Sequence, residues 1–258
     1  TTLSIKYFKK MKLNLEFVNK PPKVAKENEI ILVKDKSFKN EILKSLNKPL
    51  FTNKLFLEKK FLLKSINNKN YIFVNCIKSK TSLDYEKLGS QLYIFLKNDK
   101  IEKSFFETNL SHLTNVQLER FLHGAQLKSY EFNVYKSNKT NNETTDIYIV
   151  GVKFKKSNVL RNKLYSLLEG VFLTRDLVSE PGNILHPDEY AKRITKLRKF
   201  GLKVTVYDQK KLKKMGMNAL LGVGQGSVRG SYLVTMEWNG AKNKSKPLGF
   251  VGKGVCFD

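Results

Sequence analysis

The sequence has little cysteine and no long apolar run. Its two cysteines, Cys76 and Cys256, lie far apart, so they do not form the framework of a disulfide-stabilised secreted domain and instead suit a reducing cytoplasm. No stretch approaches the roughly 18 apolar residues that can span a bilayer. The amino terminus also lacks an apolar signal core with a cleavage site. We therefore expect a cytoplasmic protein without a membrane segment.

Arginine is also scarce: six of the 48 basic residues are arginine, although the formal net charge is +25. The charge is spread evenly, because residues 1–150 carry 27 basic and 15 acidic residues and residues 151–258 carry 21 and 8. Lysine attracts phosphate but provides little of the bidentate base recognition that arginine gives. Nucleic-acid binding is therefore the alternative function that we keep, as a rival or second activity, but do not favour.

The length and composition indicate two packed domains. Hydrophobic residues make up 41% of the chain and aromatic residues 11%, which is enough to build packed interiors. A length of 258 residues is long for one hydrophobic core. An alternating strand pattern begins near Met11, which we interpret as the natural start. The expected organisation is a non-native upstream extension at 1–10, an amino-terminal α/β domain at 11–152, a linker at 153–163 and a partial catalytic domain at 164–258.

Strands alternate with helices in the first half. Strands are predicted at 12–17, 30–33, 71–74 and 147–150, and helices at 38–46, 83–96 and 116–130. This order is typical of an α/β domain. His112 and His123 have no acidic or cysteine partner at ligand spacing, so we expect surface or capping roles for both rather than a metal site.

The second half continues this pattern. A long helix is predicted to about Val178, because Pro181 ends it, followed by a helix at 188–200, strands at 203–207 and 232–238 and a helix at 209–215. His186 lies in the turn after Pro181, where we expect a structural role. The glycine-rich stretch at 221–227 leads from a helix into a strand, so it does not fit a dinucleotide or phosphate-binding loop.

The final segment, VGKGVCFD at 251–258, carries one lysine and one aspartate in an apolar context. We expect a buried strand at 250–255, at the sheet edge where open α/β sheets hold ligands. A buried lysine is driven toward the neutral amine, which can ligate a metal, and an aspartate supplies an oxygen that two metals can share. The alternative is an ordinary strand with a lysine that extends to solvent and an aspartate that caps a helix.

Three ordered segments decide between these alternatives. Residues 174–187 (TRDLVSEPGNILHP), 215–227 (MGMNALLGVGQGS) and 251–258 resemble, in this order and at these separations, the leucyl aminopeptidase (cytosol aminopeptidase) family. The detailed match begins near Leu164. The resemblance implies an amino-terminal α/β domain followed by the first part of an α/β metallopeptidase catalytic domain with a mixed central sheet.

The resemblance also implies a site and a chemistry. Lys253 matches the lysine that ligates one metal, and Asp258 matches the aspartate that bridges two divalent ions, manganese or zinc. The catalytic residues and remaining ligands of the family would lie beyond Asp258, so we expect a truncated chain that is inactive by itself. The full-length protein is expected to form a homo-hexamer and to release amino-terminal residues, with a leucine-like preference, from peptides with a free amino terminus. Cys256 stands where threonine is most common in the family.

Overall fold

The computed structural model describes residues 11–35, 58–108, 113–137, 144–151, 158–241 and 246–256. His112, the predicted extension at 1–10 and the predicted helix at 38–46 lie outside these residues. The chain divides into two compact units, Thr1–Arg175 and Asp176–Asp258, and each is described by itself. Of the predicted linker at 153–163, residues 159–163 form the start of a helix, α6 (Val159–Ser179).

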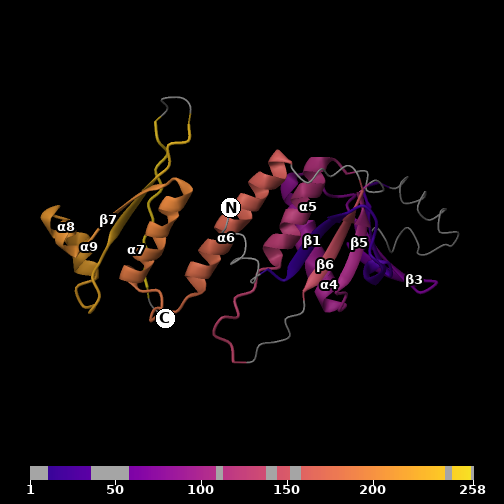
Figure 1. The fold of residues 1–258 in the computed structure, drawn as a ribbon, viewed down its shortest axis with the longest axis horizontal. Coiled ribbons are helices and arrows are strands. Elements are labelled where there is room, and N and C mark those ends of the chain that lie inside the picture. The colour runs from indigo at the N-terminus through magenta and orange to yellow at the C-terminus, as the bar shows by residue number, and fades with distance from the viewer. Residues whose placement is uncertain are drawn as a thin grey trace. The chain divides into compact units, whose positions relative to one another are not determined.

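A six-stranded sheet forms the centre of the first unit (Figure 1). Its strand order is β1-β6-β5-β2-β4-β3. The strands are β1 (Leu13–Val18), β2 (Asn28–Val33), β3 (Phe61–Ile66), β4 (Lys69–Asn75), β5 (Lys103–Glu107) and β6 (Thr145–Val150). Neighbouring strands are parallel except β3, which is antiparallel to β4. Parallel neighbours need a crossover connection. Two long helices provide such connections, α4 (Ser82–Asn98) between β4 and β5, and α5 (Asn115–Lys128) between β5 and β6. The α/β prediction is therefore confirmed.

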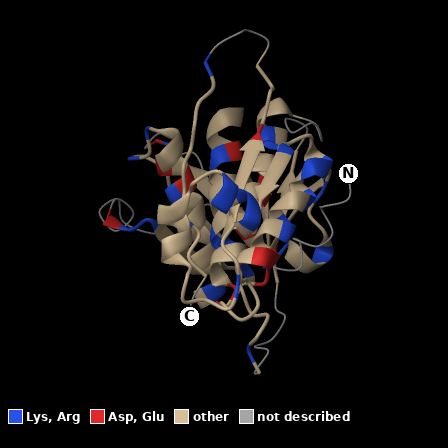
Figure 2. Cartoon of the chain, turned by 90° about the vertical axis from the view of Figure 1, so that its left-hand side faces the viewer, with Lys and Arg blue, Asp and Glu red and all other residues tan. Residues whose placement is uncertain are grey.

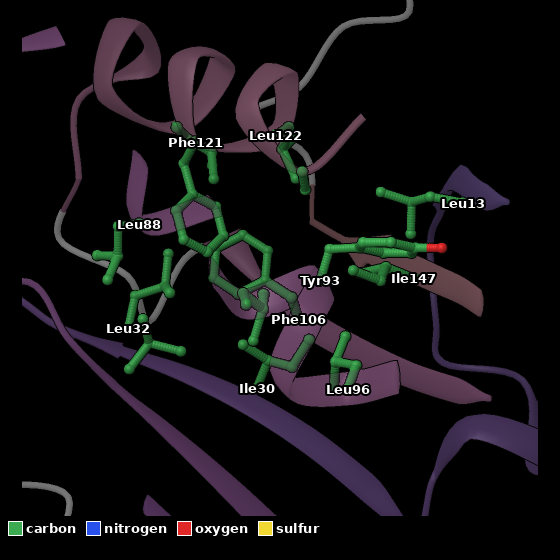
Figure 3. Close-up of a cluster of buried hydrophobic side chains, with 14 of the residues drawn as sticks. Leu13, Ile30, Leu32, Leu88, Tyr93, Leu96, Phe106, Phe121, Leu122 and Ile147 are labelled. Carbon is green, nitrogen blue, oxygen red and sulfur yellow. The ribbon is translucent and has the colours of Figure 1, made fainter. Parts of the chain in front are cut away.

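One face of this sheet packs against the helices. Figure 3 shows the resulting cluster, in which side chains of the strands meet side chains of α4 and α5. Its labelled members are Leu13, Ile30, Leu32, Leu88, Tyr93, Leu96, Phe106, Phe121, Leu122 and Ile147. Ile31 and Val33 alternate with the β2 members of this cluster and are buried as well. This explains why the strand at 30–33 is continuously apolar, since a central parallel strand is covered on both sides.

Capping boxes fix the starts of both helices. The Thr81 side chain accepts a hydrogen bond from the backbone N–H of Asp84, and the Asp84 carboxylate accepts one from the backbone N–H of Thr81. Thr114 and Gln117 form the same reciprocal pair at the start of α5. Each box satisfies backbone N–H groups that have no partner within the helix. The predicted helix boundaries therefore hold to within a few residues.

Two glycines bring α4 and α5 into backbone contact. A β-carbon on Gly89 of α4 would lie 1.8 Å from the carbonyl oxygen of Phe121, and one on Gly124 of α5 would lie 1.9 Å from that of Glu86. Such distances exclude any side chain while these backbones keep their positions. The sequence gives no sign of this requirement, because it arises only when the two helices pack.

The structure contains two strands, β3 and β5, that the sequence pattern does not predict. β3 forms a hairpin with the predicted strand β4, and its turn residues, Asn67 and Asn68, have φ angles of 48° and 59°. Asparagine is among the residues that tolerate this left-handed conformation, and tight hairpins require it. β5 was missed because its sequence, KSFFE, is short and flanked by charges, and it is stabilised by strands on both sides.

The second unit is smaller and contains a two-stranded sheet. α7 (Pro187–Thr195) continues into a 3-10 helix, η3 (Lys196–Phe200), which Gly201 ends in the left-handed conformation at φ 88°. β7 (Lys203–Tyr207) pairs antiparallel with β8 (Leu233–Glu237). Between them lie two short helices, α8 (Gln209–Lys214) and α9 (Asn218–Val223). The predicted elements at 188–215 and 232–238 are confirmed. The glycine-rich stretch at 221–227 begins in the last residues of α9 and continues as a turn at 224–227.

The predicted strand at 250–255 is not formed. Residues 246–256 contain no helix or strand, and Leu248, Phe250 and Val251 are exposed at 82%, 88% and 104%. A strand needs a neighbour that pairs with its backbone, and β7 and β8 pair only with each other in the described part of this unit. The local sequence is strand-like, but the pairing that makes a strand is absent there. Among the described helices, none is both long and apolar enough to cross a membrane.

Candidate functional site

Lys253 lies in the segment 246–256, which contains no helix or strand, and is exposed. The expectation of a buried lysine is therefore wrong for this structure, because the segment lacks the strand pairing that would cover it. Asp258 lies outside the described residues. Of the two predicted metal ligands, the structure thus places one, with its side chain in solvent.

The described residues do not complete a metal site. A lysine amine is a donor of a suitable kind for such a site when it is neutral, but Lys253 is one donor, and two divalent ions need several. Within the described ranges, no group of three or more His, Cys, Asp or Glu side chains could hold a metal ion. The donors present fit a two-metal centre in kind but not in number.

Cys256 is partly buried near the start of α7. Burial, and after it the negative charge of Asp188, raises the pKa of the Cys256 thiol. Burial also raises the pKa of the Cys76 thiol, to about 12. Both cysteines are free thiols, and a raised pKa disfavours the nucleophilic thiolate. These properties agree with the expectation that Cys256 packs as a small hydrophobic residue.

Residues 186–188 form a charged cap at the start of α7. His186 is the N-cap residue, and its Nδ1 contacts the Asp188 carboxylate. Asp188 also accepts a hydrogen bond from Nη1 of Arg229 at 3.2 Å. Desolvation acts to raise the pKa of Asp188, but hydrogen bonds from its own backbone amide and from His186 outweigh it, and the pKa is lowered. His186 has the structural role expected from the sequence.

A second set of ion pairs fixes the loop before α7. Arg193 lies within 3.1 Å of Glu180, which follows α6, and within 3.0 Å of Glu189 one helical turn earlier. Two carboxylates raise the pKa of Arg193 despite the opposing effect of desolvation. The loop between Glu180 and α7 is thus held at both ends by charge pairs, which gives α7 a fixed start. Spacing in the sequence suggests the pair with Glu189, but not the pair with Glu180.

His123 differs from its prediction as a surface or capping residue. It is buried in α5, and its Nδ1 lies 3.4 Å from the Glu86 carboxylate, which also accepts a hydrogen bond from Arg120 at 2.8 Å. Burial lowers the pKa of His123, and contact with Glu86 only partly opposes this. The buried face of α5 is wider than the spacing of its apolar residues predicts, and this explains why His123 was wrongly predicted to be a surface or capping residue.

Lys and Arg outnumber Asp and Glu in the chain, and Figure 2 marks both kinds of residue along its backbone. Lys and Arg occur on helices and loops with Asp and Glu between them. Several lysines and arginines are paired, as in Lys97 with Glu131 and Arg161 with Glu119. This distribution does not favour the nucleic-acid alternative, which depends on clustered charge.

Comparison with known proteins settles the family of the second unit. Residues 172–258 match the model of the cytosol aminopeptidase family, catalytic domain. Residues 172–258 belong to this family. The resemblance seen in the three sequence motifs is confirmed.

Curated relatives extend the match into the first unit. The chain is 39% identical over 184 residues to a probable cytosol aminopeptidase of Sinorhizobium fredii, covering 69% of this chain and 37% of that protein. It is 44% identical over 152 residues to one of Phytoplasma mali, covering 57% and 30%. The aligned part thus spans about a third of the length of these aminopeptidases.

Solved structures support the fold. A tomato leucine aminopeptidase mutant superposes with a TM-score of 0.67 at 16% identity, covering 88% of this chain and 50% of that one. The bottromycin maturation enzyme BotP, solved in complex with Mn, gives a TM-score of 0.57 at 16% identity, covering 83% and 46%. At this identity the likeness shows the α/β architecture alone.

Proposed function

We propose that the chain is the front part of a metal-dependent aminopeptidase that releases amino-terminal residues, with a leucine-like preference, from peptides with a free amino terminus. The observation that carries this proposal is the family match at residues 172–258, which includes the segment with Lys253. The ordered motifs and the aminopeptidase names of the relatives support it.

We further propose that Lys253 and Asp258 are ligands of a centre with two divalent ions, manganese or zinc. The manganese complex of BotP supports a metal of this kind. Bound ions would polarise a water molecule and the peptide carbonyl. Lys253 can ligate a metal only as a neutral amine, a form that burial and a nearby divalent ion both favour. Pairing of residues 248–256 with a further strand would cover the exposed side chains of Leu248, Phe250 and Val251 and would bury Lys253 together with them.

A direct consequence concerns activity. The described residues do not supply the number of donors that two ions need, so we expect this chain to be inactive and the full-length protein to be active. The test is hydrolysis of leucine p-nitroanilide with added Mn²⁺ by both proteins at equal concentration. Substantial turnover by residues 1–258 would refute the proposed ligand set.

We place the full-length protein in the cytoplasm, in line with the name of the family and the two free cysteines. We also propose that it forms a homo-hexamer, which the family resemblance implies. Light scattering of the intact protein tests the assembly state. The same experiment at increasing salt with added DNA tests the nucleic-acid alternative, which requires a salt-dependent complex.

A further inference from the structure

The segment that carries Lys253 contacts α7 at Gly254. A β-carbon on Gly254 would lie 3.0 Å from Cε1 and 3.5 Å from Cδ1 of Tyr190. The Tyr190 ring thus occupies the space that a side chain at position 254 would need. A substitution there can be accommodated only if the ring moves by a few tenths of an ångström.

This contact stands out within the segment. A β-carbon on Gly249 or Gly252 would meet nothing within 4 Å, and Phe250 and Val251 are exposed. Cys256, two residues after Gly254, is partly buried, and Asp188 in the first turn of α7 acts on its thiol. Among the described residues of the segment, those at 254–256 are therefore positioned by contacts with α7, whereas those at 249–252 are exposed.

α7 is a suitable support for this contact because its start is fixed. The backbone N–H of Tyr190 donates to the carbonyl of His186 at 2.9 Å. One residue earlier, Glu189 binds Arg193, which also binds Glu180. Asp188 is held between His186 and Arg229. A ring on this turn is thus presented by a rigid element, which is what accurate placement of a ligand requires.

We propose that Tyr190 is a positioning residue, whose ring seats Gly254 and thereby sets the path of the segment that bears Lys253. The proposal rests on the proposed function, because it concerns the placement of a metal ligand. Tyr190 does not itself touch substrate or metal in this account. Its ring edge provides the contact, so its hydroxyl group is not needed.

The contact is tested first in the 258-residue chain by NMR. A proton close to an aromatic ring carries a ring-current shift, so the α-protons of Gly254 are expected to move in Tyr190→Ala and to keep their position in Tyr190→Phe. The α-protons of Gly249 serve as the internal control and should not change. A Gly254 signal that is the same in wild type and Tyr190→Ala overturns the proposal.

The role in positioning is tested in the full-length protein by calorimetric titration with Mn²⁺. Loss of a residue that supports a ligand typically weakens metal binding or activity about 10–100-fold, so Tyr190→Ala should weaken Mn²⁺ binding about tenfold or more. Tyr190→Phe should bind as wild type does. Folded Tyr190→Ala protein with wild-type Mn²⁺ affinity contradicts the proposal. Wild-type protein that binds no Mn²⁺ contradicts the proposed function instead, and the Gly254 signal then still decides whether the contact exists.

A second variant covers the case in which Tyr190→Ala does not fold. Gly254→Ala places a methyl group against the ring and is expected to weaken Mn²⁺ binding in the wild-type background. In the Tyr190→Leu background, where no ring edge stands opposite, the same substitution should have a smaller effect. Equal effects in both backgrounds would show that the two positions are not coupled, and would overturn the proposal.

Discussion

The close approach of α4 and α5 makes a sharp prediction for Gly124→Ala. The added β-carbon would lie 1.9 Å from the carbonyl oxygen of Glu86 and 2.6 Å from its Cα, which are backbone atoms of a capped helix. Reaching ordinary contact requires a separation of the two helices by about 1.5 Å, and a gap of about 0.5–1 Å already removes a quarter to a half of each dispersion contact.

Two opposing effects set the magnitude. Alanine is favoured over glycine in a helix by about 1 kcal/mol. Overpacking against a rigid neighbour typically costs about 1–3 kcal/mol, occasionally more, and here the obstacle is backbone. We expect the overpacking to dominate, so Gly124→Ala should lower the free energy of unfolding by about 2 kcal/mol. Gly89→Ala, whose β-carbon would lie 1.8 Å from the Phe121 oxygen, should behave alike.

Gly170→Ala provides the matched control. Gly170 lies within α6, and a β-carbon there would meet nothing within 4 Å, so only the helix preference acts. This variant should be more stable than wild type by about 0.5–1 kcal/mol. Urea unfolding followed by circular dichroism at 222 nm measures both variants. Equal stability of Gly124→Ala and Gly170→Ala would refute the reasoning about backbone contact.

Two further predictions concern buried charge. Glu119 has 4% of its side chain exposed and is bound by Arg161 at 2.6 Å, so Arg161→Ala should lower the free energy of unfolding in urea by about 3–5 kcal/mol. Replacing both residues with Leu should recover most of this loss. A small effect of Arg161→Ala alone would contradict the ion-pair account. Burial lowers the folded-state pKa of His123, so the unfolded state binds more protons at acidic pH. The free energy of unfolding should therefore fall as pH drops below about 6.5 toward the folded-state pKa. His123→Gln should reduce the dependence of this free energy on pH between pH 7 and 5, and an unchanged dependence would show that other groups cause it.

Much of the fold could be predicted because its signals are local. The helices at 82–98 and 115–128 follow from apolar spacing and capping residues, and the strand at 30–33 follows from a continuous apolar run. The elements that were missed or misassigned depend on non-local contacts. β5 exists because two neighbouring strands pair with it, whereas residues 250–255 do not form a strand because none of the described strands pairs with them.

The candidate site likewise has features that the sequence predicts and features that only the structure shows. The order of the motifs predicts Lys253 and Asp258 as metal ligands without any structure. The Tyr190 contact with Gly254 and the pair between Arg193 and Glu180 join residues that are distant in sequence, and no pattern of residue types marks them. The sequence therefore marks the segment that carries the proposed ligands, and the contact between Gly254 and Tyr190 supports the proposal that α7 positions this segment.

The central claim is that Lys253 and Asp258 hold metal in the full-length protein. The most direct test is the metal content of purified wild type, Lys253→Ala and Asp258→Ala after equilibration with Mn²⁺ and removal of free ions, measured by mass spectrometry. We predict close to two ions per wild-type subunit, with a clear loss in both variants, while circular dichroism shows that both are folded. Undiminished metal content in either folded variant would contradict the account.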